Sequence, residues 1–502
     1  MFAAVSSATV LGAHGQPVTV EVHVSTGLPA FAIVGLPDEA CRESRDRVRA
    51  ALLSSSLPWP QKRITVNLAP SMQRKGGSSL DLAIALGVLV ASDELSQAAL
   101  SGLGFIGELG LDGTVRRLPG IVPLVGALRE LTAVVPRGCE AEANAVTPAW
   151  RSARDLAELV AVLRKQLPWP DPPAIARPIP VPSRGDMSEV RGQGLARLAV
   201  ELAAAGGHHL LLVGSPGCGK TMLAERLSGL LPDLDQAEAL VATMTHSAAG
   251  VTLPPSGLVT RPPFRAPHHT ASLVSMVGGG TAAMRPGEVS LASGGVLFLD
   301  EMSEFPVSVL DGLRQPLEEG VVRVTRARAS VEFPAQFLLV GATNPCPCGL
   351  GAAPGACRCE GAVRQRFLRR LSGPLLDRFD LRIHVTAVGS DDLLSSEPAE
   401  SSASIAQRVQ AVRTLALQRG VPSNARLSSS DLDRWATLSP NALAMVRHAI
   451  EIGRLSGRGV QRIRRVARTI DDRMGVQGAL SEQAVASALA MRIDVAPLVS
   501  AA

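Results

Sequence analysis

The chain has 502 residues, long enough for about two to four domains with sizeable cores. Its net charge of +5 permits a polyanionic partner without requiring one, and aromatic residues at 3 % are too scarce for broad base-stacking surfaces. The N-terminus lacks a basic signal-like start, and no apolar run reaches the roughly 18 residues needed to cross a bilayer, so we expect a cytoplasmic protein with no membrane partner.

Two changes in composition divide the sequence. A proline-rich stretch at 166–183 predicts an extended linker. A weaker boundary, rich in serine and glutamate, follows at 395–403. After this boundary, helical periodicity dominates, for example over 405–413. The predicted divisions are an N-terminal domain over 1–165, a linker over 166–184, an α/β core over 185–394 and a helical C-terminal domain over 395–502.

The most informative motif is G-x-x-x-x-G-K-T at 214–221. It follows an apolar stretch and precedes a helical pattern, which is the strand–loop–helix context of a phosphate-binding P-loop. Successive backbone N–H groups would surround the phosphates, Lys220 would reach the β and γ oxygens, and Thr221 would offer its hydroxyl to Mg²⁺. The predicted nucleotide-binding residues are Gly214, Ser215, Pro216, Gly217, Cys218, Gly219, Lys220 and Thr221.

The segment 246–290 is unusually long for the connection between a P-loop helix and the next strand of such a core. It contains the adjacent histidines His268 and His269. Neighbours in an extended segment point to opposite faces, so this pair is a poor ligand set for one metal ion. We expect the two histidines to make hydrogen bonds or core contacts instead.

Two further predicted strands end in polar residues. The apolar run 295–299 ends in Asp300 and Glu301, and the run 336–343 ends in Asn344. Asp300 would hold Mg²⁺, Glu301 would activate the attacking water, and Asn344 would orient that water. The alternative for the two acids is that they only cap the next helix. Together with the P-loop, these residues predict an enzyme that hydrolyses ATP.

A predicted hairpin and an arginine add two candidates for phosphate contacts. The alternating pattern over 321–328 would place Arg326 and Arg328 on one strand face, suited to nucleic-acid phosphates or simply exposed to solvent. Arg378 follows a predicted helix that could lie at a subunit edge. An arginine supplied by a neighbouring subunit accelerates hydrolysis at sites of this type, and a surface salt bridge is the alternative.

Four cysteines follow Asn344 with the spacing C-x-C-x₈-C-x-C: Cys346, Cys348, Cys357 and Cys359. In a cytoplasmic chain such a cluster favours metal or redox chemistry over disulfides. Four thiolates could form a closed structural Zn²⁺ site, but the C-x-C spacing is tighter than the usual pattern and would strain the geometry around one metal. The sequence leaves both bound Zn²⁺ and metal-free thiols open.

The order of these motifs, with RAPHHT at 265–270, GEVSLA at 287–292 and NPCPCG at 344–349, resembles the YifB/ComM group of magnesium-chelatase-like AAA+ ATPases. The resemblance extends over essentially the whole chain, from GLPD at 35–38 to RVARTI at 465–470. It implies an α/β P-loop AAA+ core, an N-terminal domain similar to the Lon protease (S5-type) fold, and a helical C-terminal lid. It also implies a ring oligomer, most simply a hexamer. ComM members are similar to hexameric helicases that drive branch migration of DNA.

The resemblance also bears on residues outside the core motifs. By similarity to chelatase and replicative-helicase lids, Arg458 would contact the γ-phosphate, with Arg462 and Arg468 as substitutes and a plain basic helix face as the alternative. Ser79 falls near the position of a Lon-type nucleophile, but the segment 119–124, where the basic lysine would lie, contains no lysine. We therefore expect a structural N-terminal domain without proteolytic activity.

These observations lead to one hypothesis and one alternative. The hypothesis is an ATP- and Mg²⁺-dependent ring motor that acts on DNA, of helicase or branch-migration type. The alternative is a chelatase-like or protein-remodelling AAA+ ATPase that does not translocate on DNA.

Overall fold

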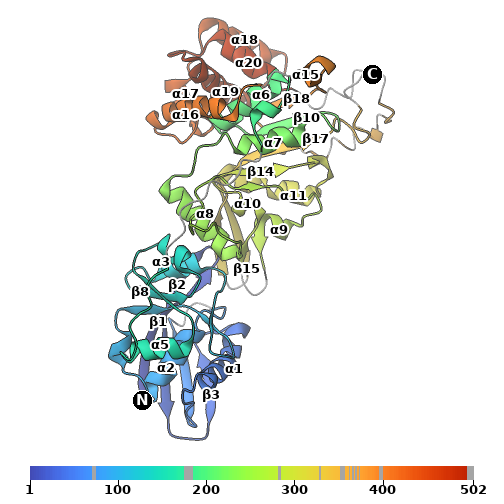
Figure 1. Ribbon diagram of the computed structural model, residues 1–502. Helices are drawn as coiled ribbons and strands as arrows, with labels where there is room; N and C mark the ends of the chain where they lie inside the picture. Colours follow the sequence, from blue (N-terminus) through green and yellow to red (C-terminus); the bar gives the residue numbers. More distant parts are fainter. Residues whose placement is uncertain are drawn as a thin grey trace.

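The chain runs from an N-terminal β-sheet through a central parallel sheet to a group of C-terminal helices (Figure 1). In this computed structural model, the described residues are 1–70, 75–173, 185–280, 284–326, 329–350, 357–360, 362–363, 367, 370–371, 373–394 and 399–493. Most of the expected linker, 174–184, lies outside them, as does Arg328. Among these residues, no helix combines the length and the apolar character that a bilayer crossing requires.

The N-terminal segment forms a seven-stranded mixed sheet in the order β3-β4-β2-β1-β5-β8-β9. Its strands are β1 (Phe2–Leu11), β2 (His14–Ser25), β3 (Ala30–Val34), β4 (Arg63–Ala69), β5 (Leu103–Phe105), β8 (Thr132–Pro136) and β9 (Trp150–Ala153), with a separate hairpin of β6 (Glu108–Leu109) and β7 (Val115–Arg116). Alternate residues such as Val18, Val20 and Val22 are buried, because successive side chains of a strand point to opposite faces.

Five helices accompany this sheet: α1 (Glu39–Ser54), α2 (Asp81–Ala91), α3 (Ile121–Ala127), α4 (Glu140–Asn144) and α5 (Leu156–Leu163). Every residue of α2 is buried, including Asp81, whose carboxylate accepts hydrogen bonds from Arg47 and Ser44. This pairing compensates a charge that would otherwise be costly to bury. An apolar helix inside the N-terminal core thus carries one fully partnered acid.

The central sheet is parallel, in the order β11-β14-β17-β10-β18. Its strands are β11 (Phe264–Arg265), β14 (Val296–Leu299), β17 (Leu338–Thr343), β10 (Leu210–Val213) and β18 (Leu381–His384). Leu210 and Leu212 face one hydrophobic core, whereas Leu211 and Val213 face another. Burial on both faces explains why these strands appear in the sequence as continuous apolar runs.

The helices of the central segment are α6 (Gly194–Gly206), α7 (Lys220–Ser228), α8 (Gln236–Ala249), α9 (Leu273–Val277), α10 (Glu288–Leu291), α11 (Val307–Gly312), α12 (Arg314–Glu319), α14 (Gly373–Leu376) and α15 (Ser390–Leu394). Two hairpins project from it: β12 (Gly278–Gly279) with β13 (Arg285–Pro286), and β15 (Val321–Arg326) with β16 (Ala329–Pro334). The second is the hairpin predicted from the alternating pattern.

The N-terminal segment contacts the central one through α3 and α8, which lie side by side in Figure 1. Gly120 and Val122, at the start of α3, donate backbone hydrogen bonds to the carbonyl and hydroxyl oxygens of Ser247 in α8, at 2.8 and 3.2 Å. Ala13, between β1 and β2, belongs to the same hydrophobic cluster as Val331 and Phe333 of the β15–β16 hairpin. The second strand of the hairpin therefore packs against the turn between β1 and β2.

The C-terminal helices are α16 (Ser402–Gln418), α17 (Ser429–Trp435), α18 (Pro440–Glu451), α19 (Gly457–Met474) and α20 (Glu482–Ala490), as the periodicity predicted. The buried Glu201 of α6 joins this group to the core, because it pairs with Arg408 of α16 and Arg473 of α19. The helical group therefore sits directly against the helix that precedes the P-loop strand.

Asp472 of α19 is the centre of a buried polar network. Its carboxylate oxygens accept two hydrogen bonds from Arg419, at 2.5 and 2.6 Å, and others from Arg468 at 3.0 Å and Asn424 at 2.8 Å. Removing the acid would leave Arg468, which is only 2 % exposed, as an uncompensated buried charge.

We expect Asp472→Ala to loosen the C-terminal helices, because losing one partner of a buried pair costs about 3–5 kcal/mol. Amide hydrogen exchange of α19 should become roughly 100- to 4,000-fold faster, since each 1.4 kcal/mol is a factor of ten. The matched control is Asp433→Ala, whose exposed side chain pairs with Arg464 and whose loss should change exchange little. Equal protection in the two variants would contradict this account of the network.

Candidate active site

Three neighbouring strands deliver the predicted site residues to one edge of the central sheet. β17 pairs in parallel with β14 on one side and with β10 on the other. The chain therefore leaves all three strands in the same direction, and the residues after their carboxyl ends meet. These residues are the P-loop after β10, Asp300 and Glu301 after β14, and Asn344 after β17.

The loop between β10 and α7 has the conformation expected of a phosphate-binding loop. Gly217 and Gly219 adopt positive φ angles of 77° and 89°, which side-chain-bearing residues rarely do. The Lys220 ammonium donates to the backbone carbonyls of Gly214 and Ser215, at 2.8 and 2.9 Å. The same ammonium also donates to Asn344 Oδ1 at 3.2 Å, so the residues after β10 and β17 are in direct contact.

Asp300 and Thr221 form the second contact across this edge. The Thr221 hydroxyl donates to Asp300 Oδ2 at 2.7 Å, while Asp300 Oδ1 accepts the backbone N–H of Glu301. A carboxylate and a hydroxyl at this spacing supply oxygen ligands of the kind that Mg²⁺ prefers, and the residues present therefore fit that ion. No side-chain capping hydrogen bond is made at the start of the short 3₁₀ helix that follows, so the capping alternative for these acids has no support there.

Glu301 adopts an unusual backbone conformation and makes a polar contact, neither of which the sequence predicted. Its φ angle is +48°, in the left-handed region that non-glycine residues rarely enter. Its carboxylate lies 3.2 Å from Nδ1 of His269, whose ring packs against His268 and the edge of Phe305. The expectation that His269 makes hydrogen bonds is consistent with this contact. His269 lies in the long segment 246–290, about 30 residues before Glu301, and no sequence-spacing rule predicts that the two side chains meet.

The residues at the ends of the three strands line a cleft of about 430 Å³. Its lining residues are Pro216, Gly217, Gly219, Lys220, Thr221, Met222, Asp300, Glu301, Ala342, Thr343 and Asn344. The cleft combines a cationic ammonium and a glycine-rich turn with two carboxylates. This arrangement suits a polyphosphate bound together with a divalent cation.

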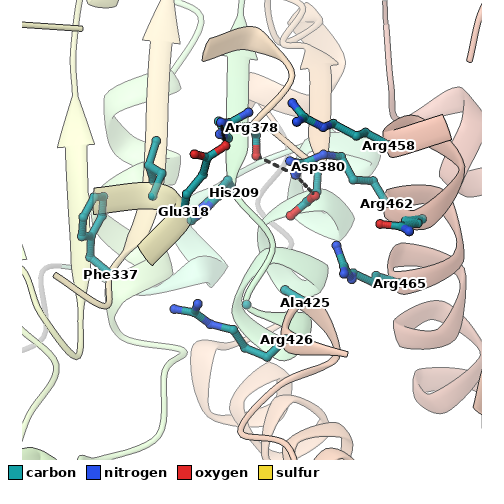
Figure 2. Close-up of a pocket in the computed structure, with 13 residues that line it drawn as sticks. His209, Glu318, Phe337, Arg378, Asp380, Ala425, Arg426, Arg458, Arg462 and Arg465 are labelled. Carbon is teal, nitrogen blue, oxygen red and sulfur yellow. Dashed lines mark hydrogen bonds and ion pairs between the residues drawn. The ribbon is translucent and has the colours of Figure 1, made fainter. Parts of the chain in front are cut away.

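Arg378 lies elsewhere, in a second pocket of about 340 Å³ that shares no lining residue with the first (Figure 2). Its guanidinium pairs with Glu318 of α12. Arg458 and Arg462 of α19 project into the same pocket, as do Arg426 and Arg465. The structure thus groups Arg378 with two of the three lid arginines proposed from the sequence.

The third lid candidate, Arg468, is occupied inside the helical group. It is 2 % exposed and donates to Asp472 and to the carbonyls of Val476 and Gly478. Arg462 donates to Asp380 Oδ1 at 2.6 Å and to the Arg378 carbonyl at 3.0 Å, which fixes α19 against the core. Arg458 has no such role among the interactions of the described residues and projects into the pocket (Figure 2).

The arginine pocket has an excess of positive charge. Burial, then the charges of Arg462 and Arg458, lower the pKa of Arg378, although Glu318 pairs with it. Burial alone would raise the pKa of Asp380, but the neighbouring His208 ring, whose Nδ1 lies 3.5 Å from Asp380 Oδ2, and the charge of Arg462 hold that pKa well below its usual range. Asp380 therefore stays ionised and partly balances the arginines. The remaining excess favours an anionic ligand.

The four cysteines lie beside the first site. Cys346 follows Asn344 by two residues, and the four sulfur atoms all lie within 4.8 Å of one another.

In the N-terminal segment, the buried Ser79 hydroxyl donates to the carbonyl of Ala8 at 2.9 Å. The hydrogen-bond partner of Ser79 is thus a backbone carbonyl.

Comparison with known proteins places these features in a family. The model for magnesium chelatase, subunit ChlI, matches residues 186–393; models for subunit ChlI of Mg-chelatase and for the ChlI C-terminal part match 20–138 and 399–492. Competence protein ComM of Haemophilus influenzae is 41% identical over 95% of this chain and 94% of its own length. Uncharacterized protein YifB of Escherichia coli is 42% identical over 92% of this chain and 91% of its own length. The magnesium-chelatase 38 kDa subunit of Rhodobacter capsulatus is 25% identical over 42% of this chain and 61% of its own length.

The partly buried imidazole of His209 predicts a pH dependence of stability. Burial lowers its pKa from 6.5 to about 4, while its Nδ1 accepts the backbone N–H of Leu339 at 3.0 Å. Below pH 6.5 the unfolded chain binds a proton that the folded chain does not, so stability falls between pH 6.5 and 4. The variant His209→Asn keeps a hydrogen-bond acceptor for the Leu339 N–H but has no group that titrates in this pH range. The melting temperature should fall less in the variant than in the parent between about pH 7.5 and 5; an equal fall would contradict the assignment.

Proposed function

The chain belongs to the YifB/ComM family of magnesium-chelatase-like AAA+ proteins, and from this premise we propose that it is an ATP-hydrolysing ring motor that acts on DNA. The observation that carries the ATPase part is the convergence of Lys220, Thr221 and Asp300 in one cleft. Glu301 and Asn344 line the same cleft.

Five side chains of the cleft have roles in this proposal. Lys220 would leave the carbonyls it now contacts and bind the β and γ phosphate oxygens. Thr221 and Asp300 would hold Mg²⁺, which neutralises charge on those oxygens. Glu301 would accept a proton from the attacking water, and Asn344 would orient that water.

The ring part of the proposal is supported by the separation of the two pockets. The cleft contains no arginine among its lining residues, whereas Arg378, Arg458 and Arg462 line the other pocket. If neighbouring protomers pack head to tail, the arginine pocket of one can face the cleft of the next. The γ-phosphate would then replace Glu318 as the partner of Arg378, and Arg458 would contribute from the lid. We propose a hexamer, as the family resemblance implies.

The DNA-acting part rests on the resemblance to the ComM group and on the β15–β16 hairpin. The hairpin carries Arg323 and Arg326 on its first strand, although Arg323 is paired with Glu319 and Glu332. A chelatase-like or protein-remodelling ATPase that does not move on DNA is the second candidate, favoured by the match of the chelatase model to 186–393. The chelatase subunit itself, however, aligns with less than half of the chain.

The two candidates differ in their response to DNA. For the DNA motor, we expect single-stranded or forked DNA to stimulate ATP hydrolysis severalfold at low salt, with the stimulation weakening as salt rises. In Glu301→Gln, hydrolysis should fall at least about 100-fold while ATP still binds, because only the base is lost. Turnover indifferent to every DNA would contradict the DNA motor and favour a protein or tetrapyrrole client.

The contact between His269 and Glu301 predicts a role for the histidine in positioning the carboxylate. We expect His269→Ala to lower kcat for ATP roughly tenfold with little change in KM, since the phosphate contacts remain. The control is His268→Ala; the neighbouring ring bonds only Thr270 among its polar contacts in the described chain, so its loss should have a small effect. An equal loss of kcat in both variants would show that the pair acts only through packing.

A further inference from the structure

The loop that follows β17 brings four thiols to one point. The sulfur of Cys346 lies 3.3 Å from that of Cys348 and 3.6 Å from that of Cys357, and the latter two are 3.6 Å apart. With Cys359, all four sulfur atoms fall within 4.8 Å of one another. The cluster therefore joins two segments, 346–348 and 357–359, that are separated in sequence.

The sulfur separations fit a metal centre and not a disulfide. A disulfide joins two sulfurs at about 2.05 Å, whereas the sulfurs of Cys346 and Cys348 are 3.3 Å apart. Four sulfurs at about 2.3 Å from a tetrahedral Zn²⁺ lie about 3.8 Å apart, close to the separations observed here. The sulfurs of Cys346 and Cys348, at 3.3 Å, lie somewhat closer than this value, in line with the tight C-x-C spacing.

The cluster is also built against the nucleotide cleft. Cys346 is fully buried and lies two residues beyond Asn344, whose side chain contacts Lys220. Gly349 adopts a φ angle of +76° and approaches Pro216 of the P-loop so closely that an added Cβ would lie 2.5 Å from the proline ring. Its N–H donates to the Cys346 carbonyl at 2.9 Å, which ties this close approach to the first cysteine.

We propose that Cys346, Cys348, Cys357 and Cys359 bind one structural Zn²⁺ that holds the loop 344–349 against the P-loop. Four thiolates are a ligand set that selects Zn²⁺ or an iron–sulfur cluster, and four protein ligands leave no open position for catalysis by the metal. The metal shapes the nucleotide cleft from outside it. The effect of the metal on the nucleotide cleft rests on the proposed function, whereas metal binding by the four cysteines does not.

The metal site is tested first by elemental analysis of the full-length protein. We expect about one Zn²⁺ per chain, lost in the double variant Cys348→Ser/Cys357→Ser and retained in Cys139→Ala, a buried cysteine of the N-terminal segment. Because the double variant could fail to fold, Co²⁺ is also exchanged into the parent protein, where tetrahedral thiolate ligation gives strong visible absorption. Absence of zinc with no uptake of added Zn²⁺ or Co²⁺ overturns the site, and iron with inorganic sulfide overturns the choice of metal.

The coupling to the cleft is tested by ATP affinity with and without the metal. A thiol reagent that releases Zn²⁺ should weaken ATP binding about tenfold, and restoring thiols and Zn²⁺ should reverse the loss. Because Cys218 lies in the P-loop, the titration is done in both the parent and Cys218→Ala, and each is compared with its own untreated form. Bound zinc with unchanged ATP affinity after release overturns the coupling. Failure of every form to bind ATP contradicts the proposed function, and the zinc content still decides the metal site.

Discussion

The parallel pairing of β14, β17 and β10 is the constraint on which the rest of the site depends. Because β17 hydrogen-bonds to both neighbours in the same direction, the turns after the three strands open at one edge. Two short side-chain contacts then connect those turns, Lys220 with Asn344 and Thr221 with Asp300. The strands are buried on both faces, so core packing positions this edge before any ligand binds.

A second principle is the division of charge between two pockets. The cleft holds one lysine and two acids, whereas the other pocket gathers arginines from the segment after α14 and from α19. Within one protomer, Asp380 and Glu318 partly neutralise these arginines. Asp380 is buried and fixes α19 to the core, but the Glu318 side chain is 54% exposed, so an incoming phosphate can displace it. In the proposed ring, Asp380 stays paired with Arg462, whereas Glu318 gives up its place beside Arg378 to the phosphate.

Much of the fold and the cleft could be predicted from the sequence, because local patterns determine them. The apolar runs before Asp300 and Asn344 and the glycines of the P-loop each identify a strand end or a turn on their own. The contacts of His269 with Glu301 and of Glu318 with Arg378 could not be predicted, since each joins segments whose proximity depends on the packing of the whole core. The cysteine spacing left bound Zn²⁺ and metal-free thiols open, because a spacing does not show whether the two C-x-C pairs meet in space; the structure brings the sulfurs of Cys346 and Cys357 to 3.6 Å.

The claim most central to this account is that one ATP site is completed by two protomers. Lys220→Ala and Arg378→Ala, each impaired in ATP hydrolysis alone, are assembled together in equal amounts. Half of the protomers then carry an intact P-loop, and half of their neighbours an intact arginine, so the account predicts recovery to about one quarter of the parental rate. Mixed rings that assemble but hydrolyse ATP no faster than either variant would contradict it.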